Sequence, residues 1–305
     1  MRTRLAALAC VGTLAALPAF AQDVSGVRQV NGTGIYCRVI GQGEPLVVVH
    51  GGPGLAHDYL FTPFSRLAAD YRLVFYDQRG SGRSDAFKPG EKVTVEDLVD
   101  DLEALRQALG LESFNLVGQS WGAIIAIRYT ARHPRHVRRL LLLEPAPGSS
   151  DALPEFQRRM AARRSQQDKD ELLALSANPA LRTDPALFKT WMNLSFKSYY
   201  FDAGKQDLEK LAYMDAERIQ KFFASSTMFG PYIATFSLYD TMAGITCPVL
   251  IVHGADDVVP TASVERMKAA MPKAELHVIG ECGHFVHVEK PDEYFRLIRT
   301  FLGAR

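Results

Sequence analysis

Short apolar runs alternate with segments of helical periodicity along most of the chain. Residues 46–49 are continuously apolar, which is typical of a strand buried on both faces. The pattern predicts strands over residues 34–40, 45–50, 72–76, 114–117, 137–143, 249–252 and 275–279. It predicts helices over residues 57–69, 95–109, 121–133, 261–271 and 291–302. Because strand and helix alternate, we predict an α/β fold in which helices flank a mostly parallel central sheet.

Residues 145–239 break this alternation. They contain no convincing buried strand, and 13 of the chain's 30 aromatic residues fall between Phe188 and Tyr239. We therefore predict a core of residues 22–144 and 240–305, with residues 145–239 inserted as a helical cap over the carboxyl edge of the sheet, where ligands bind in open α/β sheets. We expect most of these aromatic side chains to form the cap's own small core and a few to line a pocket.

Four arginines at the start of the cap lie at helical spacing, interrupted by Met160 and two alanines. We predict that they form a solvated helix face, because charged side chains at this spacing usually point into water. The four are Arg158, Arg159, Arg163 and Arg164.

The first 21 residues have the pattern of a signal peptide. A start with two arginines precedes an apolar stretch over residues 5–17, and Ala19-Phe20-Ala21 places small residues where a signal peptidase cleaves. We predict cleavage after Ala21 and a periplasmic or secreted protein. An uncleaved membrane anchor is the alternative, but the apolar stretch is shorter than the roughly 20 residues needed to span hydrocarbon.

Charge and cysteine content narrow the classes of partner and fold. The 35 basic and 34 acidic residues give a net charge of +1, so we predict no nucleic-acid partner and no stable association with a membrane. After the predicted cleavage three cysteines remain, Cys37, Cys247 and Cys282, an odd number and too few for a disulfide scaffold. The fold must therefore depend on its hydrophobic core.

A candidate nucleophile lies in the segment Gly118-Gln119-Ser120-Trp121-Gly122, between a predicted strand and a predicted helix. A nucleophile on so sharp a turn needs glycine two residues to either side, because larger side chains would collide with the neighbouring backbone. The turn exposes the serine oxygen above the sheet and places the Trp121 N–H at a helix start, where it can donate to an oxyanion. We predict that Ser120 is the nucleophile.

A serine hydroxyl needs a general base, and in this arrangement the order along the chain is serine, acid, histidine. Asp257 follows one buried strand and His284 follows the next, so both should meet Ser120 at the same sheet edge. We predict His284 as base and Asp257 as the acid that orients it, with Asp256 as the rival acid. Other histidines compete for the role of base, namely His50, His253 and His287.

The second oxyanion donor should come from the glycine-rich segment after residues 45–50. Glycines let backbone amides approach a substrate oxygen closely, and we predict the Gly52 N–H as donor. No Lys-Ser or Lys-Thr pair follows, which disfavours a phosphate-binding loop. The charged segment at residues 77–84 is expected to be structural, with Asp77 and Arg79 holding the loops beneath the nucleophile turn.

Three segments together resemble the prolyl iminopeptidase family of serine aminopeptidases: residues 50–54 (HGGPG), 77–82 (DQRGSG) and 118–122 (GQSWG). The resemblance implies an α/β-hydrolase fold with a helical cap, no metal and no cofactor. It implies a Ser120, Asp257 and His284 triad with the Gly52 and Trp121 amides as oxyanion donors. The implied reaction is removal of an N-terminal residue, often proline, from a short peptide.

In that family, glutamates of the cap hold the substrate's free amino group, near a tryptophan-rich segment. The only tryptophan of this cap is Trp191, and Glu209 and Glu217 are the available glutamates, with nothing to distinguish them from solvated helix charges. A carboxylesterase or lactonase acting on an apolar ester is therefore the alternative to an aminopeptidase or amidase. A non-catalytic binding protein on a hydrolase scaffold is the third possibility.

Overall fold

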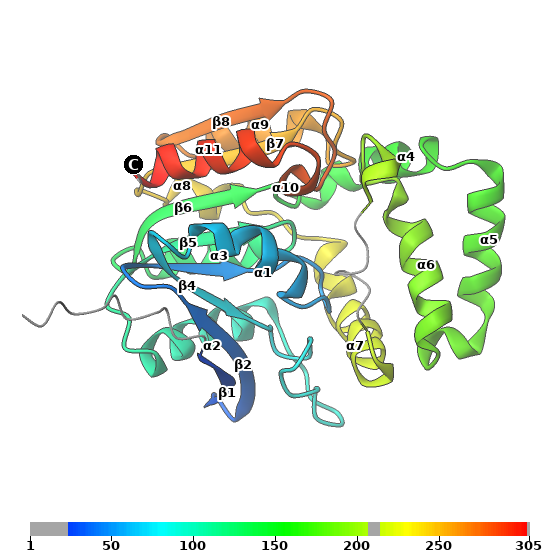
Figure 1. The fold of residues 1–305 in the computed structure, drawn as a ribbon, viewed down its shortest axis with the longest axis horizontal. Coiled ribbons are helices and arrows are strands. Elements are labelled where there is room, and N and C mark those ends of the chain that lie inside the picture. The colour runs from blue at the N-terminus through cyan, green and yellow to red at the C-terminus, as the bar shows by residue number, and fades with distance from the viewer. Residues whose placement is uncertain (1–23, 207–213, 304–305) are drawn as a thin grey trace, which may run out of the picture.

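The computed structural model describes residues 24–206 and 214–303 (Figure 1). The predicted signal peptide lies outside these residues. The strands are β1 (Val24–Val30), β2 (Thr33–Ile40), β3 (Glu44–Val49), β4 (Tyr71–Tyr76), β5 (Phe114–Gln119), β6 (Val137–Leu143), β7 (Val249–Gly254) and β8 (Ala274–Ile279).

The α-helices are α1 (Asp58–Phe64), α2 (Val95–Ala108), α3 (Gly122–Arg132), α4 (Leu153–Ala162), α5 (Gln166–Ala177), α6 (Pro185–Lys197), α7 (Ala216–Ile233), α8 (Tyr239–Ala243), α9 (Thr261–Ala270), α10 (Val286–Glu289) and α11 (Pro291–Leu302). Short 3-10 helices are η1 (Ser65–Leu67), η2 (Ser150–Ala152), η3 (Pro179–Arg182) and η4 (Ala203–Lys205). Within the described chain, no helix is both long enough and apolar enough to cross a membrane.

The strands form one sheet in the order β1-β2-β4-β3-β5-β6-β7-β8. β1 and β2 pair antiparallel, β2 joins β4 antiparallel, and every later pairing is parallel. The predicted α/β class is confirmed, and all seven predicted strands are present. β1 was not predicted, and the predicted helix over residues 57–69 is divided into α1 and η1.

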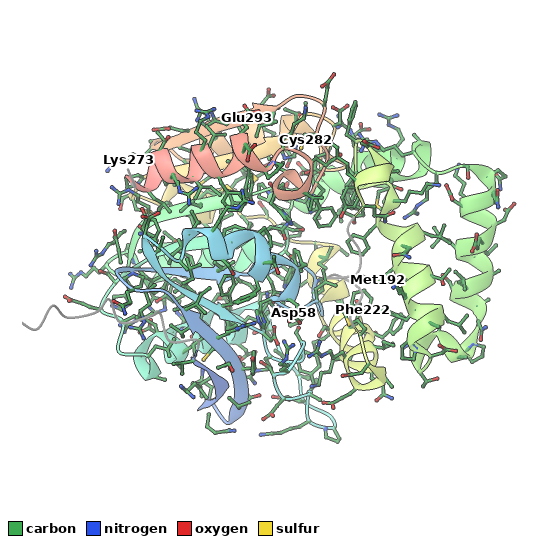
Figure 2. The ribbon with its side chains drawn as sticks, in the orientation of Figure 1. Asp58, Met192, Phe222, Lys273, Cys282 and Glu293 are labelled. Carbon is green, nitrogen blue, oxygen red and sulfur yellow. The ribbon has the colours of Figure 1, made fainter. Side chains whose placement is uncertain are left out.

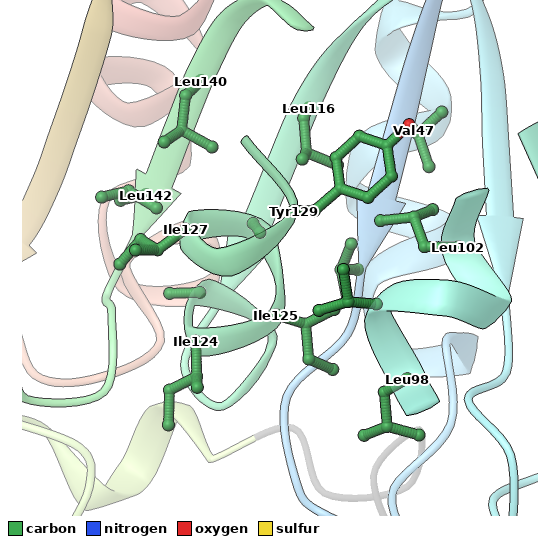
Figure 3. Packing of buried hydrophobic residues seen from close by; sticks show 14 of the residues in the cluster. Val47, Leu98, Leu102, Leu116, Ile124, Ile125, Ile127, Tyr129, Leu140 and Leu142 are labelled. Atoms are coloured by element: carbon green, nitrogen blue, oxygen red, sulfur yellow. The ribbon is translucent and has the colours of Figure 1, made fainter. Parts of the chain in front are cut away.

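Both faces of the sheet are buried, as the unbroken apolar strands predict. Val47 and Val49 of β3 pack with α2, α3 and α9 on one face, whereas Leu46 and Val48 pack with α1 and α11 on the other. Figure 3 shows the first face, where Tyr129 of α3 lies over the strands among aliphatic side chains. This double burial holds the carboxyl ends of the strands in fixed positions, so loops at that edge start from a rigid base.

The chain between β6 and β7 contains helices, and its one recorded β contact among the described residues is a bridge between Ser149 and Ser237. We call residues 145–239 the cap. Its helices α4, α5 and α6 lie beyond the arrowheads of β6 and β8 (Figure 1). Figure 2 places Met192 of α6 and Phe222 of α7 between these two helices, where both join an apolar cluster. The cap therefore lies against the edge at which the parallel strands end.

Candidate active site

The predicted nucleophile lies on a sharp turn between β5 and α3. Ser120 has a φ of 52°, a left-handed value that a non-glycine residue rarely adopts. A Cβ atom on Gly118 would lie 2.7 Å from Cα of Ala123, and one on Gly122 would lie 2.3 Å from the Val49 carbonyl oxygen. Both flanking glycines are thus required by close backbone approach, as the sequence predicted.

The turn is anchored to the neighbouring strand. The Ser120 N–H donates to the Leu143 carbonyl at 3.1 Å, and the Ser120 carbonyl accepts from the Ala146 N–H at 3.0 Å. These two bonds join the nucleophile turn to the end of β6 and the start of the cap. The strained residue is therefore held on both sides by structure outside its own turn.

Ser120, His284 and Asp257 form one hydrogen-bonded chain. Ser120 Oγ lies 2.9 Å from His284 Nε2, and His284 Nδ1 lies 2.8 Å from Asp257 Oδ2. The structure thus brings together three residues that lie up to 164 positions apart in sequence. Asp256, the rival acid, is half-buried, and its N–H donates to the Cys282 carbonyl at 2.9 Å.

Asp257 is fully buried, and its surroundings favour the carboxylate. Burial raises the pKa of this group, but the neighbouring His284 and His253 and the N–H of Val259 outweigh burial and lower it below the usual value. The Val259 N–H donates to Asp257 Oδ1 at 2.9 Å. An ionised Asp257 can therefore hold the Nδ1–H of His284 and leave Nε2 free to accept a proton from Ser120.

The other histidines considered for the base have different partners. His50 Nε2 accepts from the Gln78 N–H at 3.1 Å, and His253 Nε2 lies 3.1 Å from the Val259 carbonyl. Burial lowers the pKa of both His50 and His253. His287 is buried beside Phe285 and Tyr294. The described structure records a bond from His284 alone to Ser120.

The two predicted oxyanion donors come from different segments of the chain. Trp121 stands at the start of α3, and Gly52 lies in the loop after β3 with a φ of 131° that favours glycine. No acceptor is recorded for either N–H among the described residues. The preceding Gly51 N–H is already used, since it donates to the Tyr59 hydroxyl at 2.7 Å. The Gly52 N–H, unlike that of Gly51, therefore remains available to a ligand.

The segment predicted to be structural supports these loops from below. Asp77 accepts from His57 Nδ1 at 2.7 Å and from the Arg83 N–H at 2.8 Å, and Arg79 donates to Asp101 at 2.7 Å. Gln78 links the loop after β3 to the nucleophile turn, because its side chain donates to the His50 carbonyl and its Oε1 accepts from Trp121 Nε1 at 3.0 Å. The charges of this segment are thus paired within the fold.

A polar network beneath the nucleophile was not predicted. The Tyr59 hydroxyl donates to Gln119 Oε1 at 2.6 Å, which ties the loop of Gly52 to the residue before Ser120. Glu144 is fully buried at the end of β6, and burial followed by the charge of Asp257 raises its pKa well above the usual value. One signal for Glu144 was present, a carboxyl group directly after four leucines.

The triad opens into a cavity of about 410 Å³ between the sheet edge and the cap. Gly52, Ser120 and His284 line it on the sheet side, and Trp191, Phe196, Tyr199 and Phe222 line it from the cap, so some of the cap aromatics do face a pocket. Tyr199 also packs edge-on against His284, at 5.2 Å between ring centroids.

The prediction that four arginines form a solvated helix face is wrong for three of them. Arg158 is exposed, but Arg159 donates to the Asp257 carbonyl at 3.1 Å, Arg163 to the Ser198 carbonyl at 3.1 Å and Arg164 to the Ser195 carbonyl at 3.0 Å. Arg159 lies within α4 and reaches Asp257 from there, whereas for Arg163 and Arg164 the physical reason is a break in the helix. α4 ends at Ala162, and Ser165 caps α5, so the last two arginines lie in a turn rather than on a helix surface.

Of the two glutamates considered for amine binding, Glu217 does not line the cavity. Glu217 is exposed and pairs with Lys221 at 2.7 Å, and Glu209 lies outside the described residues. One trio in the described chain could hold a metal ion, Glu103, His133 and His136, with ligand atoms within 4.8 Å of one another. None of the three lines the cavity, and Arg106 occupies Glu103 at 2.8 Å.

A parallel sheet with a serine, histidine and aspartate chain at its carboxyl edge defines an α/β-hydrolase. The chain belongs to the alpha/beta hydrolase fold family, whose model matches residues 44–291.

Proteins named proline iminopeptidase are among its relatives. The one from Lactobacillus helveticus is 29% identical over 303 residues, covering 92% of this chain and 97% of the relative. The one from Heyndrickxia coagulans is 27% identical and covers 87% of this chain and 92% of the relative. The resemblance to prolyl iminopeptidases stated from sequence is therefore confirmed, and the protein is a prolyl iminopeptidase-like α/β-hydrolase.

Solved structures share the fold. The proline iminopeptidase of Mycobacterium smegmatis superposes with a TM-score of 0.68 at 22% identity, covering 92% of this chain and 98% of that one. Est816, described as an N-acyl homoserine lactone degrading enzyme, superposes with a TM-score of 0.64 at 25% identity, covering 90% of this chain and 100% of that one.

Proposed function

We propose that the protein is a serine hydrolase that cleaves an amide or ester bond through an acyl-enzyme on Ser120. The observation that carries this proposal is the unbroken chain from Ser120 Oγ through His284 to Asp257, at 2.9 and 2.8 Å, facing a cavity of about 410 Å³. Distances of this size are those at which a base can take a proton from a nucleophile.

The reaction follows from the geometry in two halves. Ser120 Oγ attacks the substrate carbonyl while His284 Nε2 takes its proton, and the carbonyl oxygen becomes an oxyanion held by the Gly52 and Trp121 N–H groups. His284 then protonates the leaving amine or alcohol, and the acyl group remains on Ser120. Water, deprotonated by the same imidazole, attacks the acyl-enzyme and releases the acid and free Ser120. Asp257 stays ionised throughout.

An aminopeptidase of the prolyl iminopeptidase type is the first candidate for the substrate class. Its support is the likeness to proteins named proline iminopeptidase over most of the chain. Such a reaction needs a group that holds the substrate's free ammonium.

A carboxylesterase or lactonase is the second candidate, favoured by one observation about the cavity. None of the described residues that line it carries a carboxylate, and most of its cap wall is aromatic or aliphatic. The likeness to Est816 points the same way.

A substrate panel tests the proposal and separates the two candidates. Prolyl and alanyl p-nitroanilides with free and acetylated amines are compared with p-nitrophenyl esters, using the protein and its Ser120→Ala variant. Turnover of amides that is abolished by acetylation supports the aminopeptidase, and turnover confined to esters supports the esterase. If the folded protein turns over neither and a fluorophosphonate probe does not label Ser120, the serine hydrolase is rejected in favour of a non-catalytic binding protein.

We also propose that the mature protein acts in the periplasm or outside the cell, from the signal-peptide pattern of residues 1–21. Expression of the full chain in a bacterium, followed by N-terminal sequencing of the exported protein, tests this. A mature chain that begins at Gln22 supports the proposal, and an intact Met1 start in the cytoplasm contradicts it.

A further inference from the structure

The charges lining the cavity are all of one kind. Apart from the imidazole of His284, the ionised side chain among its described lining residues is Arg164, and none of those residues is acidic. A guanidinium group keeps its charge at any physiological pH and presents several N–H donors in one plane, which suits a carboxylate.

Arg164 is held in place by the cap without being neutralised. Its Nη2 donates to the Ser195 carbonyl at 3.0 Å, and Ser195 also lines the cavity. Its Nε is buried with no hydrogen-bond acceptor in the part of the chain that the structure describes. The Ser195 carbonyl is thus the one recorded acceptor of this guanidinium among the described residues, and a neutral carbonyl does not compensate its charge.

The acidic residue near Arg164, Asp168, already forms an ion pair with Lys197. Asp168 acts on Arg164 electrostatically, but both oxygens of Asp168 lie 3.0 Å from Lys197 Nζ. No ion pair to Arg164 within 4.0 Å is recorded among the described residues. Burial lowers the pKa of Arg164, which reflects the desolvation that an anionic partner would offset. Arg164 thus has the surroundings of a cation that lacks its counter-ion.

We propose that Arg164 binds a carboxylate group of the substrate, so that the natural substrate is a small ester or amide that also carries an anionic group. The inference rests on the proposed hydrolysis at Ser120 and names the substrate class for that same cavity. A free ammonium group would be repelled by Arg164 and would find no carboxylate in the described wall. The inference therefore favours the ester or blocked-amide substrate over the N-terminal amine.

Matched substrate pairs test this proposal. p-Nitrophenyl butyrate and hexanoate are compared with the p-nitrophenyl monoesters of glutarate and adipate, and phenyl acetate is compared with 4-acetoxybenzoate. These pairs place the carboxylate on the acyl side or on the leaving side. We expect at least one anionic member to exceed its neutral counterpart in kcat/KM by about 10-fold or more, mainly through KM, as a charge-assisted hydrogen bond would give.

Variants show whether the preference belongs to Arg164. Arg164→Gln should lower kcat/KM for the preferred anionic substrate about 10- to 100-fold and leave its neutral partner within about 3-fold, and Arg164→Lys should retain part of the preference. Arg163→Gln is the matched control, since Arg163 also donates to a cap carbonyl but does not line the cavity. It should leave both substrates unchanged.

A further measurement does not depend on the folding of any variant. Glutarate and adipate should inhibit turnover of a neutral ester by the unsubstituted protein competitively and more weakly as salt rises, whereas the corresponding diamides should not inhibit. The proposal is overturned if no anionic substrate is preferred, or if Arg164→Gln slows neutral and anionic esters equally. Absence of all turnover together with absence of fluorophosphonate labelling of Ser120 would instead overturn the proposed hydrolase, and this inference with it.

Discussion

The two walls of the cavity are built from different kinds of interaction. On the sheet side, buried polar groups bond to one another, from Asp257 through His284 to Ser120 and from Tyr59 to Gln119. On the cap side, aromatic rings and one arginine face the space. The sheet wall therefore fixes a reacting geometry, whereas the cap wall offers shape and charge. This difference indicates that chemistry and substrate choice can be altered separately.

Of the substitutions in the sheet wall, removal of the nucleophile should lower kcat the most. Ser120→Ala is expected to lower kcat by about 10⁵- to 10⁶-fold, because no hydroxyl remains to form the acyl-enzyme. Steady-state assays with the best ester measure the loss, and circular dichroism checks that the fold is kept. Ser226→Ala is the matched control on the cap wall, where the Ser226 hydroxyl bonds the Phe222 carbonyl at 2.9 Å. A loss of similar size in both variants would contradict the division between the walls.

Neutralising the acid should have the next largest effect. Asp257→Asn is expected to lower kcat about 10⁴-fold, because an amide cannot stabilise the imidazolium or fix the tautomer of His284. Asp256→Asn, one position earlier and half-buried, should leave kcat within about 3-fold. If the two variants lose activity equally, Asp257 is not the orienting acid.

The central strands of the sheet could be predicted because they are buried on both faces, so short unbroken apolar runs identify them. β1 escaped prediction because it is an edge strand of mixed character, with exposed Val24 and Val27. Its pairing with β2, rather than its own pattern, gives it strand structure.

The positions of Ser120, Asp257 and His284 could likewise be predicted, since each follows a predicted parallel strand and all parallel strands end at one edge. Arg164 could not, because helical spacing suggests a continuous helix through residue 164, whereas the capping by Ser165 starts a new one. What holds Arg164 at the cavity is its hydrogen bond to the Ser195 carbonyl of α6, a contact between distant residues that no local pattern encodes.

Disturbing the contact between the two walls should cause the third-largest loss of kcat. The His284 N–H donates to the Tyr199 carbonyl of the cap at 2.6 Å, and a Cβ on Gly283 would lie 2.2 Å from that same oxygen. Gly283→Ala should therefore displace His284 from Ser120 and lower kcat about 100-fold.

Gly280→Ala in the same loop is the control for this substitution, because a Cβ there meets nothing within 4 Å. It should leave kcat close to that of the unsubstituted protein. An unchanged kcat in Gly283→Ala would show that the two walls are not coupled through this contact.

The smallest expected effect concerns the support beneath the sheet wall. Burial raises the pKa of Asp77, but its hydrogen bond to His57 and the charges of His57 and His50 outweigh burial, and the pKa falls to about 2 from 3.8. Because the pKa of Asp77 is lower in the folded protein than in the unfolded chain, ionised Asp77 stabilises the fold at pH values above about 3.8. This stabilisation is lost as the pH falls toward 2. The contribution is about 2 kcal/mol.

Denaturant unfolding of the unsubstituted protein and Asp77→Asn tests this pH dependence. The difference in free energy of unfolding between the two should shrink by about 2 kcal/mol as the pH is lowered from 5 to 2. A difference that stays constant over this range would show that Asp77 is not ionised in a stabilising pairing.

The most direct test of the central claim is the rate at which a fluorophosphonate labels Ser120, followed by intact mass and peptide mapping. We predict one adduct, on Ser120, whose rate of formation collapses in His284→Gln and is unchanged in Arg164→Gln, because the sheet wall alone activates the oxygen. Labelling at another residue, or equal rates in the unsubstituted protein and His284→Gln, would contradict the account.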